Sequence, residues 1–125
     1  MTRIMGMITA LAIGAALLAS TAAAKDGDIE VAGTCTRAST SELKLSAEDG
    51  GIEVEFEVDQ NRRGVRWVVT LHRNGVLVGS RVRVTRGPSG SFEARFVTRN
   101  GAGADRFVAR AARVGERCVA RATFA

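Results

Sequence analysis

Apolar and polar residues alternate with a period of two along most of the chain after Asp28, in short runs separated by Gly, Asn and Asp. This spacing is typical of β-strands that bury one face, and no window shows the period of a helix. The clearest run is residues 52–58, where apolar side chains face one way and glutamates the other. The pattern predicts eight strands, at residues 28–35, 41–47, 51–59, 64–73, 76–85, 91–98, 105–113 and 117–124.

The turns between these runs predict which strands pair. Asn74-Gly75 is a strong signal for a two-residue hairpin, because a type I′ turn needs positive φ at both central residues. A two-residue turn sets Arg73 opposite Val76 and, further back, Trp67 opposite Val82. We expect residues 59–64 to form a second hairpin. Together the two hairpins predict a buried cross-strand row of Phe56, Trp67 and Val82, and a charged row on the other face of Glu57, Arg66 and Arg83.

Further turns complete the expected order. Residues 48–51 and 114–116 each join two successive strands, and the loop around Pro88 is suited to crossing between sheets. Eight short strands with a tryptophan on a central one indicate an all-β fold, a two-sheet antiparallel sandwich of about seven or eight strands. A five-stranded OB barrel is the second choice, because the strand count fits it less well.

Residues 65–71, the Asn74-Gly75 turn and residues 105–111 give the chain a generic likeness to known modules. It resembles bacterial immunoglobulin-like or fibronectin-III-like domains and, more loosely, small exported actinobacterial proteins of unknown function. The resemblance implies a β-sandwich fold. One difference is the position of the cysteines, which lie on the first and last strands rather than on the two core strands of antibody domains.

The first 24 residues look like a signal peptide rather than part of the fold. Arg3 supplies a positive start, residues 4–18 are apolar, and Ala22 to Ala24 offer a cleavage site. We therefore expect a secreted, extracellular protein with a single domain at residues 25–125 and no transmembrane segment in the mature chain. Cys35 and Cys118, the only cysteines, are expected to form an intramolecular disulfide.

Charge is unevenly distributed along the chain. Ten acidic residues lie between Lys25 and Gln60, whereas fourteen arginines and only three acidic residues follow. Strand alternation places a set of arginines outward on the last three strands, which would form an anion-binding face. The set is Arg95, Arg99, Arg106, Arg110, Arg117 and Arg121.

Catalytic chemistry has little support in the sequence. His72 is the only histidine and lies on the outward side of a strand end, and no hydrolase elbow, zincin or phosphate-loop motif occurs. The row Glu53, Glu55 and Glu57 is better read as a solvated face than as a pair of catalytic carboxylates. A calcium site at residues 48–49 and 59–61 is a weaker possibility, because turn chemistry explains those residues. We expect no enzyme activity, no cofactor and no metal.

The sequence therefore predicts a secreted, non-enzymatic binding or interaction module whose partner is an unknown extracellular protein or an anionic polymer. One hypothesis places the contact surface on exposed loops, at residues 59–64 and 86–91, as in a small enzyme inhibitor. Another is a polyanion or cell-envelope polymer binder that uses the arginine face. Few aromatic residues fall on outward positions, so no specific nucleic acid is expected.

Overall fold

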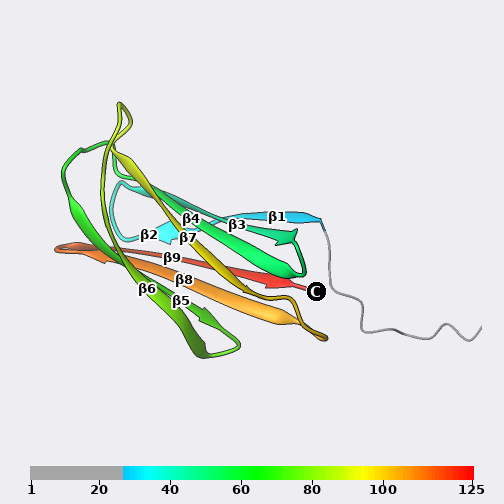
Figure 1. The fold of residues 1–125 in the computed structure, drawn as a ribbon. Helices are drawn as coiled ribbons and strands as arrows, with labels where there is room; N and C mark the ends of the chain where they lie inside the picture. The colour runs from blue at the N-terminus through cyan, green and yellow to red at the C-terminus, as the bar shows by residue number, and fades with distance from the viewer. Residues whose placement is uncertain (1–26) are drawn as a thin grey trace, which may run out of the picture.

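The computed structural model describes residues 27–125, and the predicted signal peptide and its cleavage site lie outside the described residues. The described chain forms an all-β sandwich of two antiparallel sheets, as predicted (Figure 1). Its strands are β1 (Asp28–Ala32), β2 (Thr34–Cys35), β3 (Thr40–Glu48), β4 (Gly51–Asp59), β5 (Arg66–Arg73), β6 (Val76–Val84), β7 (Ser91–Arg99), β8 (Asp105–Arg113) and β9 (Glu116–Phe124).

The two layers have different memberships. Sheet A has the order β1-β3-β4-β7, and sheet B has the order β2-β9-β8-β5-β6. The first predicted strand is divided between the two sheets at Gly33, where a Cβ atom would lie 2.8 Å from the carbonyl oxygen of Val119. The alternative of a five-stranded OB barrel is wrong, because the strands form two separate sheets. The two sheets form an open two-layer antiparallel sandwich.

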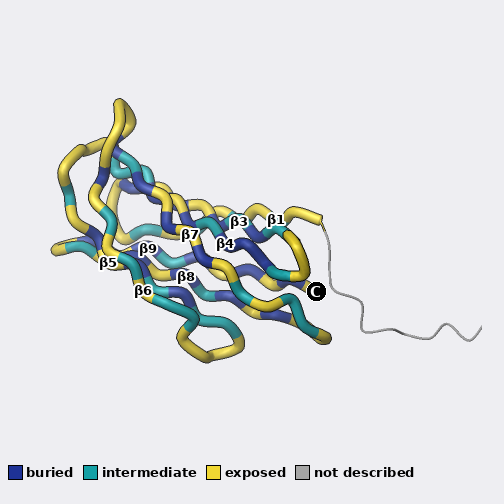
Figure 2. Tube along the Cα trace, viewed as in Figure 1, coloured by how far each residue is buried: buried dark blue, intermediate teal, exposed yellow. Residues whose placement is uncertain are grey.

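The core lies between the sheets, because each strand turns its alternate apolar residues inward (Figure 2). Trp67 is fully buried, and its indole N–H donates to Oε1 of Gln60 at 3.0 Å. Its ring lies 5.7 Å from that of Phe92, which comes from the opposite sheet. The predicted burial of Trp67 is confirmed, and Phe56 is buried as well, but Val82 is 48% exposed and lies outside the core.

Two predicted pairings are wrong. Residues 59–64 do not form a hairpin but connect β4 in sheet A to β5 in sheet B. Phe56 and Trp67 therefore lie on opposite sheets within the same core and are not cross-strand neighbours. The predicted charged row is also absent: Glu57 pairs with Glu42 and Glu93, and Arg66 pairs with Val84.

The Asn74-Gly75 hairpin is confirmed at its turn, where Arg73 pairs with Val76. Beyond it, an irregularity between Leu71 and His72 shifts the register, so that Trp67 pairs with Arg83 instead of Val82. One extra residue reverses which side chains point inward. The extra residue is Val78, which lies between the paired residues Leu77 and Gly79. An added Cβ at Gly79 would approach the Phe96 ring to 3.3 Å. The hairpins at residues 48–51 and 114–116 and the crossing loop at Pro88 are confirmed.

The predicted disulfide is present. Cys35 on β2 and Cys118 on β9 are paired directly opposite each other, with a Cα to Cα distance of 4.0 Å. The bond therefore joins neighbouring strands of sheet B, and it closes a loop with a sequence separation of 83 residues. It attaches the start of the domain to its last strand.

Candidate functional site

The six arginines predicted to share one face are divided between the two sheets. Arg106, Arg110, Arg117 and Arg121 lie on β8 and β9 of sheet B, whereas Arg95 and Arg99 lie on β7 of sheet A. The prediction of one face for all six is therefore wrong. Alternation had assigned each side chain to the outside correctly, but it carries no information about which sheet a strand joins.

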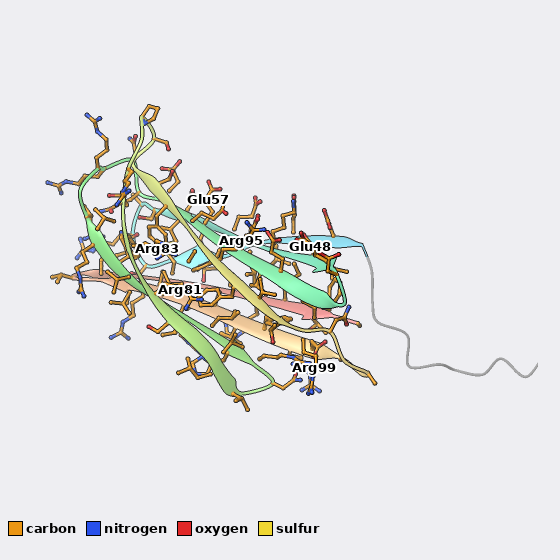
Figure 3. All side chains as sticks on the ribbon, viewed as in Figure 1. Glu48, Glu57, Arg81, Arg83, Arg95 and Arg99 are labelled. Carbon is orange, nitrogen blue, oxygen red and sulfur yellow. A yellow bond between two sulfur atoms is a disulfide. The ribbon has the colours of Figure 1, made fainter. Side chains whose placement is uncertain are left out.

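The outer face of sheet A, here called the acidic face, carries most of the carboxylates of the protein. Its acidic residues are Asp28, Glu30, Glu42, Glu48, Glu53, Glu55, Glu57, Asp59 and Glu93. Among residues 27–125, only Lys44, Arg95 and Arg99 bring positive charge to it. Glu42, Glu57 and Glu93 stand side by side on three neighbouring strands. Figure 3 shows Glu48 and Glu57 pointing away from the core on this side.

Arg95 is already engaged on the acidic face. Its guanidinium forms an ion pair with Glu53, with Nη2 and Oε2 2.5 Å apart. The hydrogen bond and ion pair with Arg95 lower the pKa of Glu53 to about 2. The neighbouring Glu53 carboxylate raises the pKa of Glu48 and of Glu55. Arg95 is thus a neutralised charge within an acidic surface rather than part of an anion site.

The outer face of sheet B, here called the basic face, carries five arginines. Arg110 on β8 has Thr70 and Val119 beside it, and Arg117 and Arg121 lie diagonally from it on β9. Such diagonal neighbours are about 7–8 Å apart. The fifth is Arg66 on β5, which the sequence placed in a charged row with Glu57. All five side chains are exposed, and within residues 27–125 none makes an ion pair or hydrogen bond through its guanidinium.

No carboxylate lies on the described basic face. Nine of the thirteen acidic residues belong to the acidic face, and Asp26 lies outside the described residues. Of the other three, Asp49 is in a turn, Asp105 binds Arg73, and Glu116 binds Arg113. Arg73 and Arg113 are therefore neutralised in place. The charge segregation along the sequence becomes a segregation between the two outer faces.

A shallow hollow of about 300 Å³ lies on the basic face between Arg110 and Arg117. Val68, Ala112 and Val119 line it. Arg110 and Arg117 line the same hollow. The hollow therefore combines an apolar floor with two unpaired positive charges, and alternation alone does not reveal it because three different strands contribute.

His72 lies on the same outer face and is half-buried, between Val108 on β8 and Leu77 on β6. Its Nδ1 atom is shut off from solvent and has no hydrogen-bond partner within the described chain. Nothing in the described structure orients this ring toward a nucleophile.

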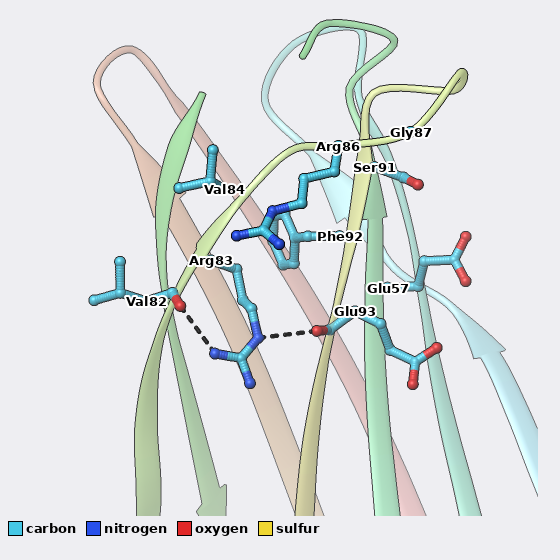
Figure 4. A pocket seen from close by; sticks show the side chains of 9 residues that line it. All are labelled: Glu57, Val82, Arg83, Val84, Arg86, Gly87, Ser91, Phe92 and Glu93. Atoms are coloured by element: carbon cyan, nitrogen blue, oxygen red, sulfur yellow. Dashed lines mark hydrogen bonds between the residues drawn. The ribbon is translucent and has the colours of Figure 1, made fainter. Parts of the chain in front are cut away.

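A second, larger cleft of about 690 Å³ opens where the edge strands β6 and β7 face each other (Figure 4). Arg83 spans it: its Nε atom donates to the carbonyl oxygen of Glu93 at 3.1 Å, and Nη1 donates to that of Val82 at 2.9 Å. Further along, the Arg81 guanidinium lies 4.6 Å from the centre of the Phe96 ring. Charged side chains that cap free edge carbonyls prevent pairing with other strands. We therefore infer that Arg81 and Arg83 protect the free edges of β6 and β7 from pairing with strands of other molecules.

The residues suggested for calcium do not come together. Residues 48–49 and residues 59–61 lie at opposite ends of β4, and Asp59 accepts a hydrogen bond from the amide of Asn61 within its own turn. Among residues 27–125, the only cluster of metal-ligating types is Cys35, Glu116 and Cys118. Both cysteines are committed to the disulfide, so no thiolate is available there.

Comparison with known proteins adds no family. No protein-family model matches the chain, and no curated protein matches it. Within the described residues there is no helix long and apolar enough to cross a membrane.

Proposed function

We propose that this protein is an exported, non-enzymatic binding module that holds a polyanion on the basic face of sheet B. The observation that carries the proposal is the absence of any carboxylate among five exposed, unpaired arginines on that face. A surface that served only to keep the protein in solution would gain from interspersed charges of both signs. The compartment rests on the signal-peptide pattern and is compatible with the disulfide.

The arrangement suits a flat, repeating anion. Arg110, Arg117 and Arg121 form a triangle on two neighbouring strands, so that successive charges of a polymer can meet successive guanidinium groups. Arginine binds phosphate and sulfate through two parallel N–H donors, which gives it an advantage over lysine at such a face. The acidic face on the other side orients the protein, because an anionic partner repels it.

The test is the salt dependence of binding to heparin or DNA. Counterion release predicts a log–log slope of roughly 0.7–0.9 per phosphate neutralised for nucleic acid. Replacing Arg110, Arg117 and Arg121 together by Gln should reduce that slope by about two to three. The matched control removes the same charge elsewhere, by replacing Arg62, Arg63 and Arg86, which are exposed in loops. If both triple variants lower the slope equally, the binding depends on the net charge of the protein and not on the basic face. No retention on heparin at low ionic strength would refute the proposal.

A second candidate is a protein-interaction module that uses the two loops, as a small enzyme inhibitor does. The amide of Gln60 donates to the carbonyl oxygen of Gly90 at 3.1 Å, so the loops at residues 59–64 and 86–91 support each other at one end of the sandwich. Gly90 packs so closely on Arg62 that a Cβ atom would lie 2.7 Å from its carbonyl carbon. The loop variant above tests this candidate: it should lose a protein partner from a pull-down while keeping heparin binding.

A further inference from the structure

The basic face carries exposed apolar side chains that a hydrated polymer does not use. Four of the seven exposed large hydrophobic residues of the described chain belong to it: Val68, Leu77, Val82 and Val84. Val68 pairs with Val82 across β5 and β6, and Val84 follows two residues along the same strand. These three form one contiguous patch, here called the valine strip. Exposed apolar side chains that lie next to one another form a candidate contact surface for another apolar phase or molecule.

The valine strip lies on β5 and β6, whereas four of the five arginines of the basic face lie on β8 and β9; the fifth, Arg66, pairs with Val84 beside the strip. One cross-strand row shows the order directly, because Val82, Val68, Ala112 and Arg117 follow each other across β6, β5, β8 and β9. The hollow beside Val68 lies where the two halves meet, and Arg110 and Arg117 line it. The face is thus amphipathic from one edge of the sheet toward the other.

A protein face that is cationic in one half and apolar in the other complements the surface of an anionic bilayer. Phosphate groups there lie a few ångströms above the acyl chains. A tilt of sheet B that lowers its β5–β6 half places the valine strip at the acyl boundary and leaves the arginines of β8 and β9 among the phosphate groups. The negative potential of such a membrane attracts clustered arginines and repels carboxylates. The acidic face would therefore turn away from the membrane, which leaves sheet B in contact with it.

We propose that the basic face docks on a bilayer of anionic phospholipid, with phosphates held by Arg110, Arg117 and Arg121 and the valine strip at the acyl boundary. This inference rests on the proposed anion-binding face and adds the apolar contact. The proposed ligand of the whole face is a lipid surface, and binding of a soluble phosphate polymer alone is the competing outcome.

The experiment measures sedimentation of the mature protein with vesicles of phosphatidylcholine alone and of phosphatidylcholine containing phosphatidylglycerol. Heparin retention is measured in parallel. The strip variant is Val82→Ser with Val84→Ser, both on an edge strand. Its matched control is Val97→Ser with Val114→Ser, two residues that are 70% and 96% exposed and lie outside the basic face. If the strip variant does not fold by circular dichroism, Val82→Ser alone replaces it.

We expect binding to the anionic vesicles and none to phosphatidylcholine alone. The strip variant should bind anionic vesicles roughly ten-fold more weakly and keep the heparin elution of the wild type. The arginine variant should lose vesicle binding by about 100-fold and lose heparin as well. Vesicle binding by the strip variant equal to that of the wild type would overturn the inference and leave the polyanion function standing. Vesicle binding without heparin retention would refute the polyanion function alone.

Discussion

Replacement of Trp67 by alanine should remove a large part of the stability of this domain. The indole is fully buried between the sheets, packs on Phe92 and donates a hydrogen bond to Gln60. The Arg113 guanidinium also lies 5.6 Å from its ring centre. Deleting a buried tryptophan side chain costs about 3–5 kcal/mol, from lost transfer free energy and the cavity left behind. A domain of this size has only about 5–15 kcal/mol in total.

The expected loss translates into a large fall of the melting temperature. For a domain of 60–100 residues, 1 kcal/mol corresponds to about 4–8 °C, so the variant should melt roughly 12–40 °C lower. Urea unfolding followed by far-ultraviolet circular dichroism measures the free energy directly, because the variant has no tryptophan left to report by fluorescence.

Val82→Ala is the matched control, since a regular two-residue hairpin would place Val82 in the same buried row as Trp67. The bulge turns Val82 outward, where it is 48% exposed, so its loss should cost no more than about 0.5 kcal/mol. Comparable losses in the two variants would show that the register shift is wrong. A loss below 1 kcal/mol for Trp67→Ala would refute the core packing itself.

The remaining predictions concern the disulfide and a buried carboxylate. The exported protein should lack residues 1 to about 24 and have a mass two protons below that of its reduced form, and alkylation of two thiols under native, non-reducing conditions would contradict this. Burial of Glu116 would raise its pKa, but hydrogen bonds from Ser39 and the contact with Arg113 outweigh that effect and lower it. The stability from this lowered pKa is present above the unfolded-state pKa and lost as pH falls through the folded-state pKa. Glu116→Gln should therefore cost about 2–3 kcal/mol at pH 7 and progressively less in acid urea titrations, whereas a difference that does not change with pH would contradict the assignment.

Local patterns in the sequence were sufficient for most of the fold. The predicted strands at residues 51–59 and 105–113 agree with β4 and β8 residue for residue, and the three short turns predicted as hairpins all join neighbouring strands. Alternation predicts on which face of the sheet a side chain lies, and a tight turn predicts that the strands on either side of it pair. Both are local properties of the sequence. The disulfide could be predicted from the even number of cysteines and the expected oxidising compartment.

The errors concern long-range relations. The loop at residues 59–64 has the composition of a hairpin turn, yet it crosses between sheets, and nothing near it in sequence specifies that β4 pairs with β7. Gly79 within a strand was the one local sign of the bulge, since an isolated glycine there often marks one. Arg66 was missed as a member of the basic face because that wrong pairing had given it Glu57 as a partner.

The order of the chain explains how the two faces obtained opposite charge. The acid-rich segment builds β1, β3 and β4, which are three of the four strands of sheet A, and the arginine-rich segment builds β5, β6, β8 and β9 of sheet B. Only β7 leaves the arginine-rich half, and there Arg95 is neutralised by Glu53.

Keeping the charges separate costs stability. Glu42, Glu57 and Glu93 repel one another across neighbouring strands, as do the diagonal arginines of β8 and β9. Exchanging a glutamate from one face with an arginine from the other would relieve both repulsions and leave the core unchanged. An abundance of arginine explains its total number but not this placement, whereas the anionic partner that we propose would use both faces, one to bind and the other to set the orientation.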